Sequence, residues 1–425
     1  MMSKKIGLKE AISIGIGGMV GGGIFAVLGL AVSLAKGGTP IAFLIAGILA
    51  LITSYSYVKL SVSYPDRGGT VKFVNQGFGN SIFSGGINNL LWASYIIMLS
   101  LYASAFGSYA LNLFEIINKS IDFHIYTSSI IIIATTINYY SIKVVSKIES
   151  YAVIIKLIIL LLFVIIGCYG LYENPNLTQL SVSNWETPIQ LLTGGMVIFV
   201  AYEGFELIAN AAPDIENPEK NIPRAYYYSV IFVIFLYIII AIVTVGSLPF
   251  NEIATAQDYV LAKAAEPMLG KIGFTIITIA ALISTFSAIN ASLYGGSRVS
   301  YEIAEDGELP KHLTKMLWNQ PVGLLITAIF TIVIANLLNL ESISITGSVG
   351  FLFIFAIVNL IGYKLSNNIN GSKTIPLLGF ILCLVALIIL ILQQFNSNKL
   401  GVIIAISIIF LCFFIEWIYK RSIKK

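Results

Sequence analysis

The stretch that decides the fold is an apolar run rich in glycine, Gly15-Ile16-Gly17-Gly18-Met19-Val20-Gly21-Gly22-Gly23-Ile24-Phe25. It lies in a charge-poor segment, residues 9–35, which is long enough to cross a membrane because a span needs ~20 apolar residues. Six of the nine residues from Gly15 to Gly23 are glycine. Each glycine costs a helix interior about 1 kcal/mol relative to alanine. The run therefore predicts a membrane span that is unwound near its middle.

The composition of the whole chain excludes a soluble globular protein. Of its 425 residues, 57% are hydrophobic and 11% are charged, and the mean hydropathy is +0.89. Soluble domains are about 45–50% apolar and about 25% charged, and single cores stop growing near ~250–300 residues. The net charge of +4 comes from scattered lysines, which argues against a nucleic-acid partner. The chain is predicted to be an all-α polytopic protein whose surroundings are the lipid bilayer.

Twelve charge-poor apolar segments are predicted to be transmembrane helices, and turns containing polar residues, glycine or proline separate them. They occupy almost the whole chain, so we expect a single transmembrane domain over residues 1–425 and no soluble domain. The predicted segments are 9–35, 40–63, 81–117, 124–141, 148–171, 188–212, 224–247, 270–303, 322–338, 343–364, 375–393 and 398–419.

Lysine and arginine set the expected orientation, because cytoplasmic loops are enriched in both. With the N-terminus inside, the cytoplasmic segments hold 19 of the 25 Lys and Arg residues and the opposite loops hold five. The remaining one, Lys156, falls in the middle of the fifth span. We therefore expect a multi-pass protein of the cell membrane with both termini in the cytoplasm.

The sixth span is the second unusual one. It contains two carboxylates, Glu203 and Glu206, near the depth of the bilayer. Interrupted spans in corresponding positions of two halves indicate the binding site of an inverted-repeat transporter. Spans one and six are five apart, which predicts repeats over 9–171 and 188–364, with two further helices at 375–419.

Each interruption would expose backbone groups that a ligand can use. The half-helix that begins near Gly22–Ile24 offers N–H groups and the positive end of a helix dipole, which suit a carboxylate. The half-helix that ends near Ile16–Gly17 offers carbonyls, which suit an ammonium group or a small cation. A zwitterion such as an amino acid fits both ends. The alternative is that the glycines serve close helix packing.

Four motifs along the chain resemble those of the amino acid–polyamine–organocation (APC) transporters. The resemblance covers the whole chain, in order and with the spacing of that family. The motifs are Gly21–Phe25, Tyr64–Thr70, Phe199–Glu206 with its sequel through Pro218 to Ala225, and Asn290–Arg298 followed by Ala304–Pro310.

The resemblance implies a LeuT-type fold, with five helices repeated in inverted topology, helices one and six unwound, and two C-terminal helices. It also implies secondary transport of amino acids or amines by alternating access. Carried onto this chain, the substrate carboxylate would meet the backbone at Gly21, Gly22 and Gly23. The substrate amine would meet carbonyls near Ile16 and those of Phe199, Val200 and Ala201.

Two positions depart from the family pattern. Val200 stands where some relatives place a bulky aromatic over the substrate, so either Phe199 covers the site or nothing does. Glu203 replaces a residue that is usually apolar. Its carboxylate would select cationic substrates or would pair with a neighbouring helix, while we interpret Glu206 as structural or gating.

Lys156 is the most unusual residue of the fifth span. An ammonium group at mid-bilayer costs roughly 2.5–3.5 kcal/mol on insertion scales, unless the side chain snorkels to the interface. A lysine there resembles that of the proton-coupled, broad-specificity prokaryotic amino acid permeases, in which the ammonium takes the place of a sodium ion. The resemblance implies that Lys156 carries the coupled proton, with the Gly17 carbonyl and the Ser284 hydroxyl as partners.

Competing functions remain open within transport. The chain is predicted to be a proton-coupled symporter, with an exchanger that favours cationic amino acids or polyamines as the alternative. A passive channel is the rival from another class. An enzyme is not expected, because the two histidines, His124 and His312, fall in predicted loops on opposite sides. No cofactor, no metal site and no obligatory protein partner are predicted.

Overall fold

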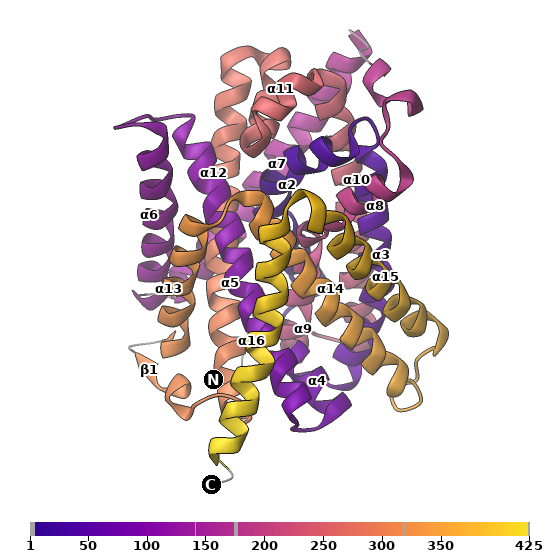
Figure 1. The fold of residues 1–425 in the computed structure, drawn as a ribbon, viewed down its shortest axis with the longest axis vertical. Coiled ribbons are helices and arrows are strands. Elements are labelled where there is room, and N and C mark those ends of the chain that lie inside the picture. The colour runs from indigo at the N-terminus through magenta and orange to yellow at the C-terminus, as the bar shows by residue number, and fades with distance from the viewer. Residues whose placement is uncertain (1–4, 141, 174–176, 318–319, 424–425) are drawn as a thin grey trace.

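The computed structural model describes residues 5–140, 142–173, 177–317 and 320–423, and most of these residues are helical. Figure 1 shows a bundle of helices, with both ends of the chain in its lower half. Nine of the described helices are long and apolar enough to cross a membrane, so the chain is a multi-pass membrane protein. They are α3 (Thr39–Ser63), α5 (Ile82–Leu111), α6 (Lys119–Tyr140), α7 (Ile142–Glu173), α10 (Pro218–Ser247), α12 (Val260–Glu305), α14 (Leu340–Lys364), α15 (Thr374–Ser397) and α16 (Lys399–Ile423).

Two further spans consist of bent pairs of helical segments. α1 (Leu8–Met19) meets α2 (Gly23–Ala35) at 45°, and α8 (Pro188–Val197) meets the segment Phe199–Asp214 at 43°. That segment contains two 3-10 turns, η3 (Phe199–Ala201) and η4 (Glu203–Glu206), and the short helix α9 (Leu207–Ala211). Both bends lie in spans whose sequence predicts an interruption. If each pair counts as one span, eleven candidates result.

The ninth predicted segment, 322–338, forms the apolar helix α13 (Val322–Leu337). At 16 residues it is shorter than the ~20 residues of a typical span. Each of the twelve predicted segments thus contains helix, although the length and composition of the described helices support nine to eleven spans.

Several elements differ from the predicted pattern. The eighth predicted segment begins at residue 270, but α12 begins at Val260 and is broken at Gly270, where φ is 60° and ψ is −152°. A short helix, α4 (Thr70–Phe78), and the two-stranded pair β1 (Met316–Leu317) and β2 (Gln320–Pro321) occupy predicted connections. Such short elements contribute little to a hydropathy pattern, which records spans of membrane length. One more short helix, α11 (Phe250–Thr255), precedes η6 (Gln257–Tyr259).

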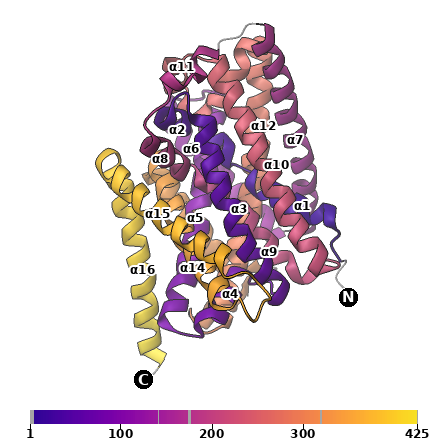
Figure 2. The same ribbon diagram turned by 90° about the vertical axis from the view of Figure 1, so that its right-hand side faces the viewer.

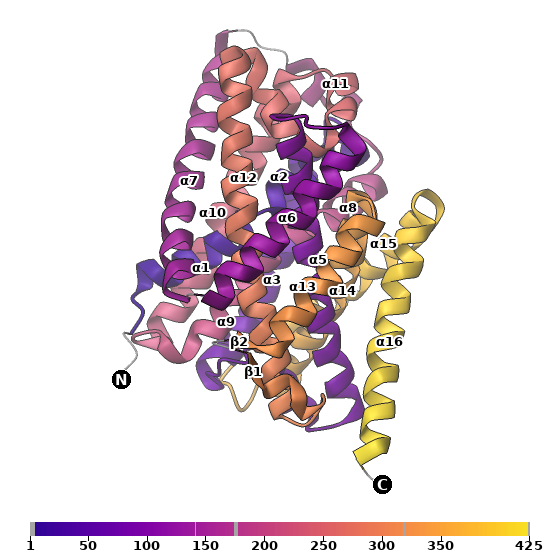
Figure 3. The same ribbon diagram turned by 90° about the vertical axis from the view of Figure 1, so that its left-hand side faces the viewer.

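Burial separates central helices from peripheral ones. In its most apolar window, α14 has 89% of its residues buried and α5 has 83%, whereas α6 and α16 have 28% each. Figures 2 and 3 show α16 at one edge of the bundle and α7 toward the opposite edge. The peripheral helices carry exposed Ile, Leu and Phe side chains, as expected for surfaces that face lipid. The two bent spans lie within this frame, between α3, α5, α10 and α14.

Candidate functional site

The unwound turn between α1 and α2 is held by side chains from three other helices. Backbone carbonyls that leave a helix inside a membrane require partners from protein or water. Here α7, α10 and α12 each supply a donor, so the turn is supported along its whole length. The donor–acceptor pairs are Lys156 Nζ to Gly17 O at 3.0 Å, Tyr237 Oη to Met19 O at 2.7 Å, and Ser284 Oγ to Val20 O at 3.0 Å and also to Gly21 O.

Lys156 is fully buried, although only 33% of the residues in the most apolar window of its helix are buried. Its side chain therefore turns toward the protein interior and not toward lipid. One turn earlier on α7, Val153 packs against Gly17, where an added Cβ would lie 3.0 Å from Val153 Cγ2. The missing side chain at Gly17 brings α1 and α7 together, which lets the ammonium group reach the Gly17 carbonyl. The Ser284 hydroxyl bonds to the next part of the same turn.

The interruption of the sixth span is supported in a similar way. Ser344 and Ser348, one turn apart on α14, donate to the Val197 carbonyl at 2.8 and 2.9 Å. The Ser348 hydroxyl also accepts from the Val200 N–H at 3.3 Å. Tyr237 connects the two interruptions, because its hydroxyl lies 3.3 Å from the Ala201 carbonyl as well as 2.7 Å from that of Met19.

Glycines bring the two interrupted spans into direct backbone contact. A Cβ added at Gly204 would lie 2.2 Å from the carbonyl carbon of Gly18, and one added at Gly18 would lie 2.6 Å from the Gly204 carbonyl oxygen. A Cβ at Gly23 would lie 2.8 Å from the Ala201 Cα. No larger residue fits at this crossing without displacing backbone. Close packing therefore accounts for Gly18, Gly204 and Gly23 in this conformation.

The residues predicted to contact substrate gather around these two interruptions, and the structure buries them. The Ile16 carbonyl accepts the Val20 N–H at 2.7 Å, so one of its two lone pairs is occupied. The first N–H groups of α2, at Gly23 and Ile24, have no acceptor within an α-helix. The exposed fractions are 9% for Ile16, 6% for Glu203, 1% for Val200 and Ala201, and 0% for Ile24 and Phe199, and Gly21, Gly22 and Gly23 are buried as well.

Tyr102 of α5 covers the first interruption, a role that the sequence did not reveal. A Cβ at Gly22 would lie 2.1 Å from the Tyr102 ring, so the ring rests directly on the glycine backbone. The Tyr102 hydroxyl donates to Glu203 at 3.4 Å. Phe199, one of the two alternatives for a cover in the sequence, packs edge-on against Phe355 of α14 with ring centroids 5.7 Å apart.

The two carboxylates of the sixth span have separate surroundings. Glu206 is fully buried and accepts hydrogen bonds from Thr70 at 2.9 Å and from Tyr95 at 3.4 Å. Glu203, which is 6% exposed, accepts only from Tyr102 among the described residues. Glu206 is thus built into contacts between α4, α5 and the sixth span.

The sequence did not predict that Tyr237, Ser344 and Ser348 act as donors to the interruptions. Their only signal is a hydroxyl in an otherwise apolar helix, which Ser and Thr can satisfy on their own helix. No local pattern distinguishes such a residue from one that reaches across to an unwound backbone. Among the described residues, no group of three or more His, Cys, Asp or Glu side chains is placed to hold a metal ion.

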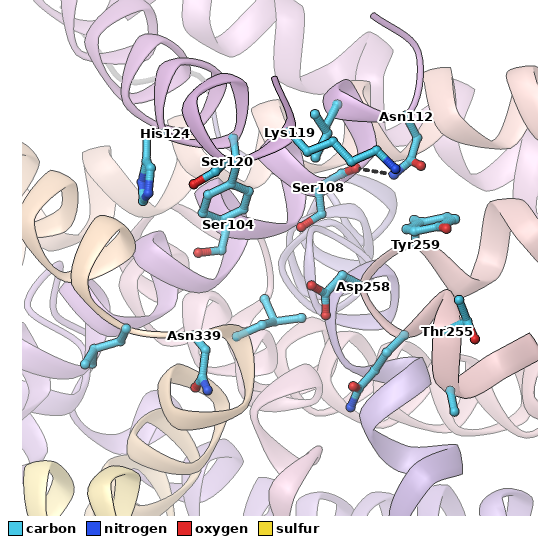
Figure 4. A pocket seen from close by; sticks show the side chains of 16 residues that line it. Ser104, Ser108, Asn112, Lys119, Ser120, His124, Thr255, Asp258, Tyr259 and Asn339 are labelled. Carbon is cyan, nitrogen blue, oxygen red and sulfur yellow. Dashed lines mark hydrogen bonds between the residues drawn. The ribbon is translucent and has the colours of Figure 1, made fainter. Parts of the chain in front are cut away.

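A cavity of about 620 Å³ lies apart from the interruptions, at the end of the bundle away from the chain termini. It opens between the end of α5, the start of α6, the η6 turn and the connection from α13 to α14 (Figure 4). His124, predicted in a loop, belongs to α6 and lines this cavity together with the charged residues Lys119 and Asp258. We call it the outer cavity below.

Comparison with known proteins accounts for this architecture. The amino acid permease family model matches residues 6–416. An uncharacterized protein of Methanocaldococcus jannaschii is 35% identical over 100% of this chain and 97% of its own length. The inner membrane transport protein YbaT of Escherichia coli is 32% identical over 99% and 97%, and the branched-chain amino acid permease BcaP of Bacillus subtilis is 22% identical over 84% and 80%. The relatives whose names assign a role are transporters and not enzymes. The chain belongs to the amino acid permease family.

Proposed function

We propose that this permease is a secondary active transporter that carries amino acids by alternating access in symport with protons, and that Lys156 carries the proton. The observation that carries the proposal is the buried ammonium group of Lys156 on the Gly17 carbonyl, 3.0 Å away, at the interruption of the first span. Burying a charge is costly unless it is paired or hydrogen-bonded. A residue that is kept at such a cost, beside unwound backbone in a transporter, is expected to act in transport.

The proton would act through the contact between α7 and α1. A charged lysine donates a charge-assisted hydrogen bond, which is roughly twice as strong as a neutral one. Loss of the proton leaves a neutral amine, and the bond to Gly17 weakens. α1 would then be free to move relative to α7, so protonation of Lys156 would bias the equilibrium between the two conformations.

The substrate would bind where the two interruptions meet. Its carboxylate would accept from the first N–H groups of α2 at Gly23 and Ile24, and its ammonium group would donate to carbonyls at Ile16 and of the Phe199–Ala201 turn. Because these groups are buried, binding requires that Tyr102 move away from Gly22. We extend the proposal to twelve spans in a five-plus-five inverted repeat, and to a plasma-membrane orientation with both termini in the cytoplasm.

The test is uptake into proteoliposomes loaded at a higher internal pH than the bath. The wild type is expected to accumulate a labelled amino acid above its external concentration, and Lys156→Ala to reach only the external level. Lys271→Ala, at an exposed position of α12, is the matched control and should accumulate like the wild type. Undiminished gradient-driven accumulation by Lys156→Ala would refute the coupling role. Uptake that never exceeds equilibrium in the wild type would instead indicate a passive channel.

A second candidate is an exchanger that favours cationic amino acids or polyamines. Glu203 motivates it, because among the residues that the structure describes this buried carboxylate accepts one hydrogen bond, at 3.4 Å, from Tyr102. If Glu203 selects cations, Glu203→Gln should reduce the ability of arginine to compete with alanine for uptake. Unchanged competition would assign Glu203 to packing with α5. Efflux of preloaded substrate that requires an external amino acid would distinguish exchange from symport.

A further inference from the structure

The outer cavity is lined by two side chains of opposite charge, Asp258 and Lys119, that are not paired within the described part of the chain. Asp258 lies in η6 and Lys119 begins α6, and both line the cavity (Figure 4). Among the described residues, neither side chain makes a hydrogen bond or an ion pair, whereas other charges on this end of the protein do, such as Lys263 with Glu252 and Glu266.

Local helix structure does not account for Asp258, and Lys119 lies at the unfavourable end of its own helix. Asp258 lies just before α12, where a carboxylate can cap the helix, but the N-cap residue is Tyr259 and no side-chain cap bond forms there. Lys119 is the first residue of α6, where the helix dipole disfavours a cation. The end of α5, at Asn112, provides a favourable dipole for the ammonium group, and Figure 4 shows Lys119 extending toward that residue.

The outer cavity has the size and lining of a small-molecule site. Its volume of about 620 Å³ falls within the ~300–1,000 Å³ of ligand pockets. Hydroxyl groups from Ser104 and Ser108 face it along α5, and the buried Ser104 hydroxyl has no hydrogen-bond partner among the described residues. Leu338 and Phe123 add apolar surface.

We propose that the outer cavity is a second amino acid site, in which Asp258 binds the ammonium group of a zwitterion and Lys119 binds its carboxylate. The proposal rests on the proposed function only for the identity of the cargo. The substrate side chain would lie against Leu338 and Phe123, and the serine hydroxyls would complete the hydrogen bonds of the carboxylate.

Two elements that line or contact this cavity, α5 and η6, also connect it to the helices of the first interruption. A Cβ added at Gly29 of α2 would lie 2.1 Å from the Gln257 carbonyl oxygen, so η6 rests directly on α2. Ser104 lies two residues beyond Tyr102 on α5, about 3 Å along the helix axis, and Tyr102 covers Gly22. An amino acid in the outer cavity would thus lie close to α2 and to α5, whose Tyr102 covers the first interruption. The cavity would act as a loading site for the proposed substrate site between the two interruptions.

The experiment uses the full-length protein in lipid nanodiscs and three probes, L-alanine, ethylamine and propionate, titrated by saturation-transfer NMR. Asp258→Asn should lower the affinity for ethylamine at least tenfold, and it should lower the affinity of the weaker of two alanine sites by the same factor. One charge-assisted hydrogen bond corresponds to about that factor. Lys119→Gln should weaken propionate and alanine but not ethylamine. Glu252→Gln, which removes an exposed carboxylate outside the cavity lining, is the matched control and should leave all three unchanged.

The outcomes separate the outer site from the proposed function. A single alanine site that Asp258→Asn leaves intact, with normal uptake in proteoliposomes, would overturn the outer site and leave the transport proposal standing. Loss of ethylamine binding in both Asp258→Asn and Glu252→Gln would also overturn it, because the attraction would then be diffuse surface charge. Absence of uptake by the wild type for every amino acid would refute the proposed function, while the three titrations would still decide whether Asp258 and Lys119 form a site.

Discussion

The contact between Gly18 and Gly204 makes Gly204→Ala a sharp test of the architecture around the proposed substrate site. An alanine Cβ at position 204 would lie 2.2 Å from the Gly18 carbonyl carbon and 2.4 Å from the Met19 nitrogen. Carbon atoms in contact prefer about 3.5–4.0 Å, so the two backbones must separate by more than 1 Å. Neither partner is a side chain that can rotate away.

The expected magnitude follows from that geometry. Overpacking a well-packed interior costs typically 1–3 kcal/mol, and we expect the upper end because both partners are backbone. The matched control is Gly194→Ala in α8, where the Cβ would make an ordinary contact at 3.4 Å with Ala35. Since alanine is favoured over glycine in a helix by about 1 kcal/mol, Gly194→Ala should be neutral or stabilising. The same chemical change is thus predicted to have opposite signs in two halves of one span.

The assay heats the detergent-solubilised protein for a fixed time at a series of temperatures and measures the monodisperse fraction by size-exclusion chromatography. A fixed time is needed because membrane proteins unfold irreversibly, so their stability is a rate. Gly204→Ala should lose its monodisperse peak at a clearly lower temperature than the wild type and should transport poorly. A Gly204→Ala protein that matches the wild type in both respects would refute the close crossing of the interrupted spans.

Two further predictions concern the hydrogen bond from Tyr237 at the interruptions and the pH dependence of stability that Glu308 causes. Tyr237→Phe removes the donor to the Met19 carbonyl, at 2.7 Å, and should cost about 1–3 kcal/mol in the same heating assay and reduce uptake, whereas Tyr228→Phe, at an exposed position of the same helix, should change neither. Burial raises the pKa of Glu308, which lies in the connection after α12; because its folded pKa is above its unfolded value of about 4.3, stability should fall as pH rises from the unfolded pKa through the folded pKa. In the same heating assay at a series of pH values, Glu308→Gln should flatten this fall in stability above the unfolded pKa, and an unchanged fall would assign it to other groups.

Much of the membrane architecture could be predicted from local sequence. Helix-forming apolar runs are recognisable because each must satisfy its own backbone in lipid. The interruption of the first span was predictable from its clustered glycines, which weaken a helix wherever it is placed. That of the sixth span was predictable from its two carboxylates near the depth of the bilayer. The inward direction of Lys156 also followed, because an ammonium group facing lipid is too costly.

The contacts that support the interruptions could not be predicted in this way. Tyr237 and Ser344 resemble ordinary residues of their helices, and they act only because α10 and α14 pass beside the interruptions of the first and sixth spans. From the sequence, either Phe199 or no residue was expected to cover the site, and nothing in the sequence pointed to Tyr102 of α5, which lies over Gly22. The outer cavity brings together Asp258 and Lys119 from connections more than a hundred residues apart.

Local hydropathy is enough to predict that this chain crosses the membrane many times. The break in the first span follows from its glycines, and the break in the sixth from two carboxylates at membrane depth, because these features lie within single helices. The contacts between helices show which groups satisfy the broken backbone, which glycines serve as contact surfaces and, among the described residues, where opposite charges lie unpaired. Those outcomes depend on distances between helices, and helix-to-helix distances are set by packing across the whole bundle.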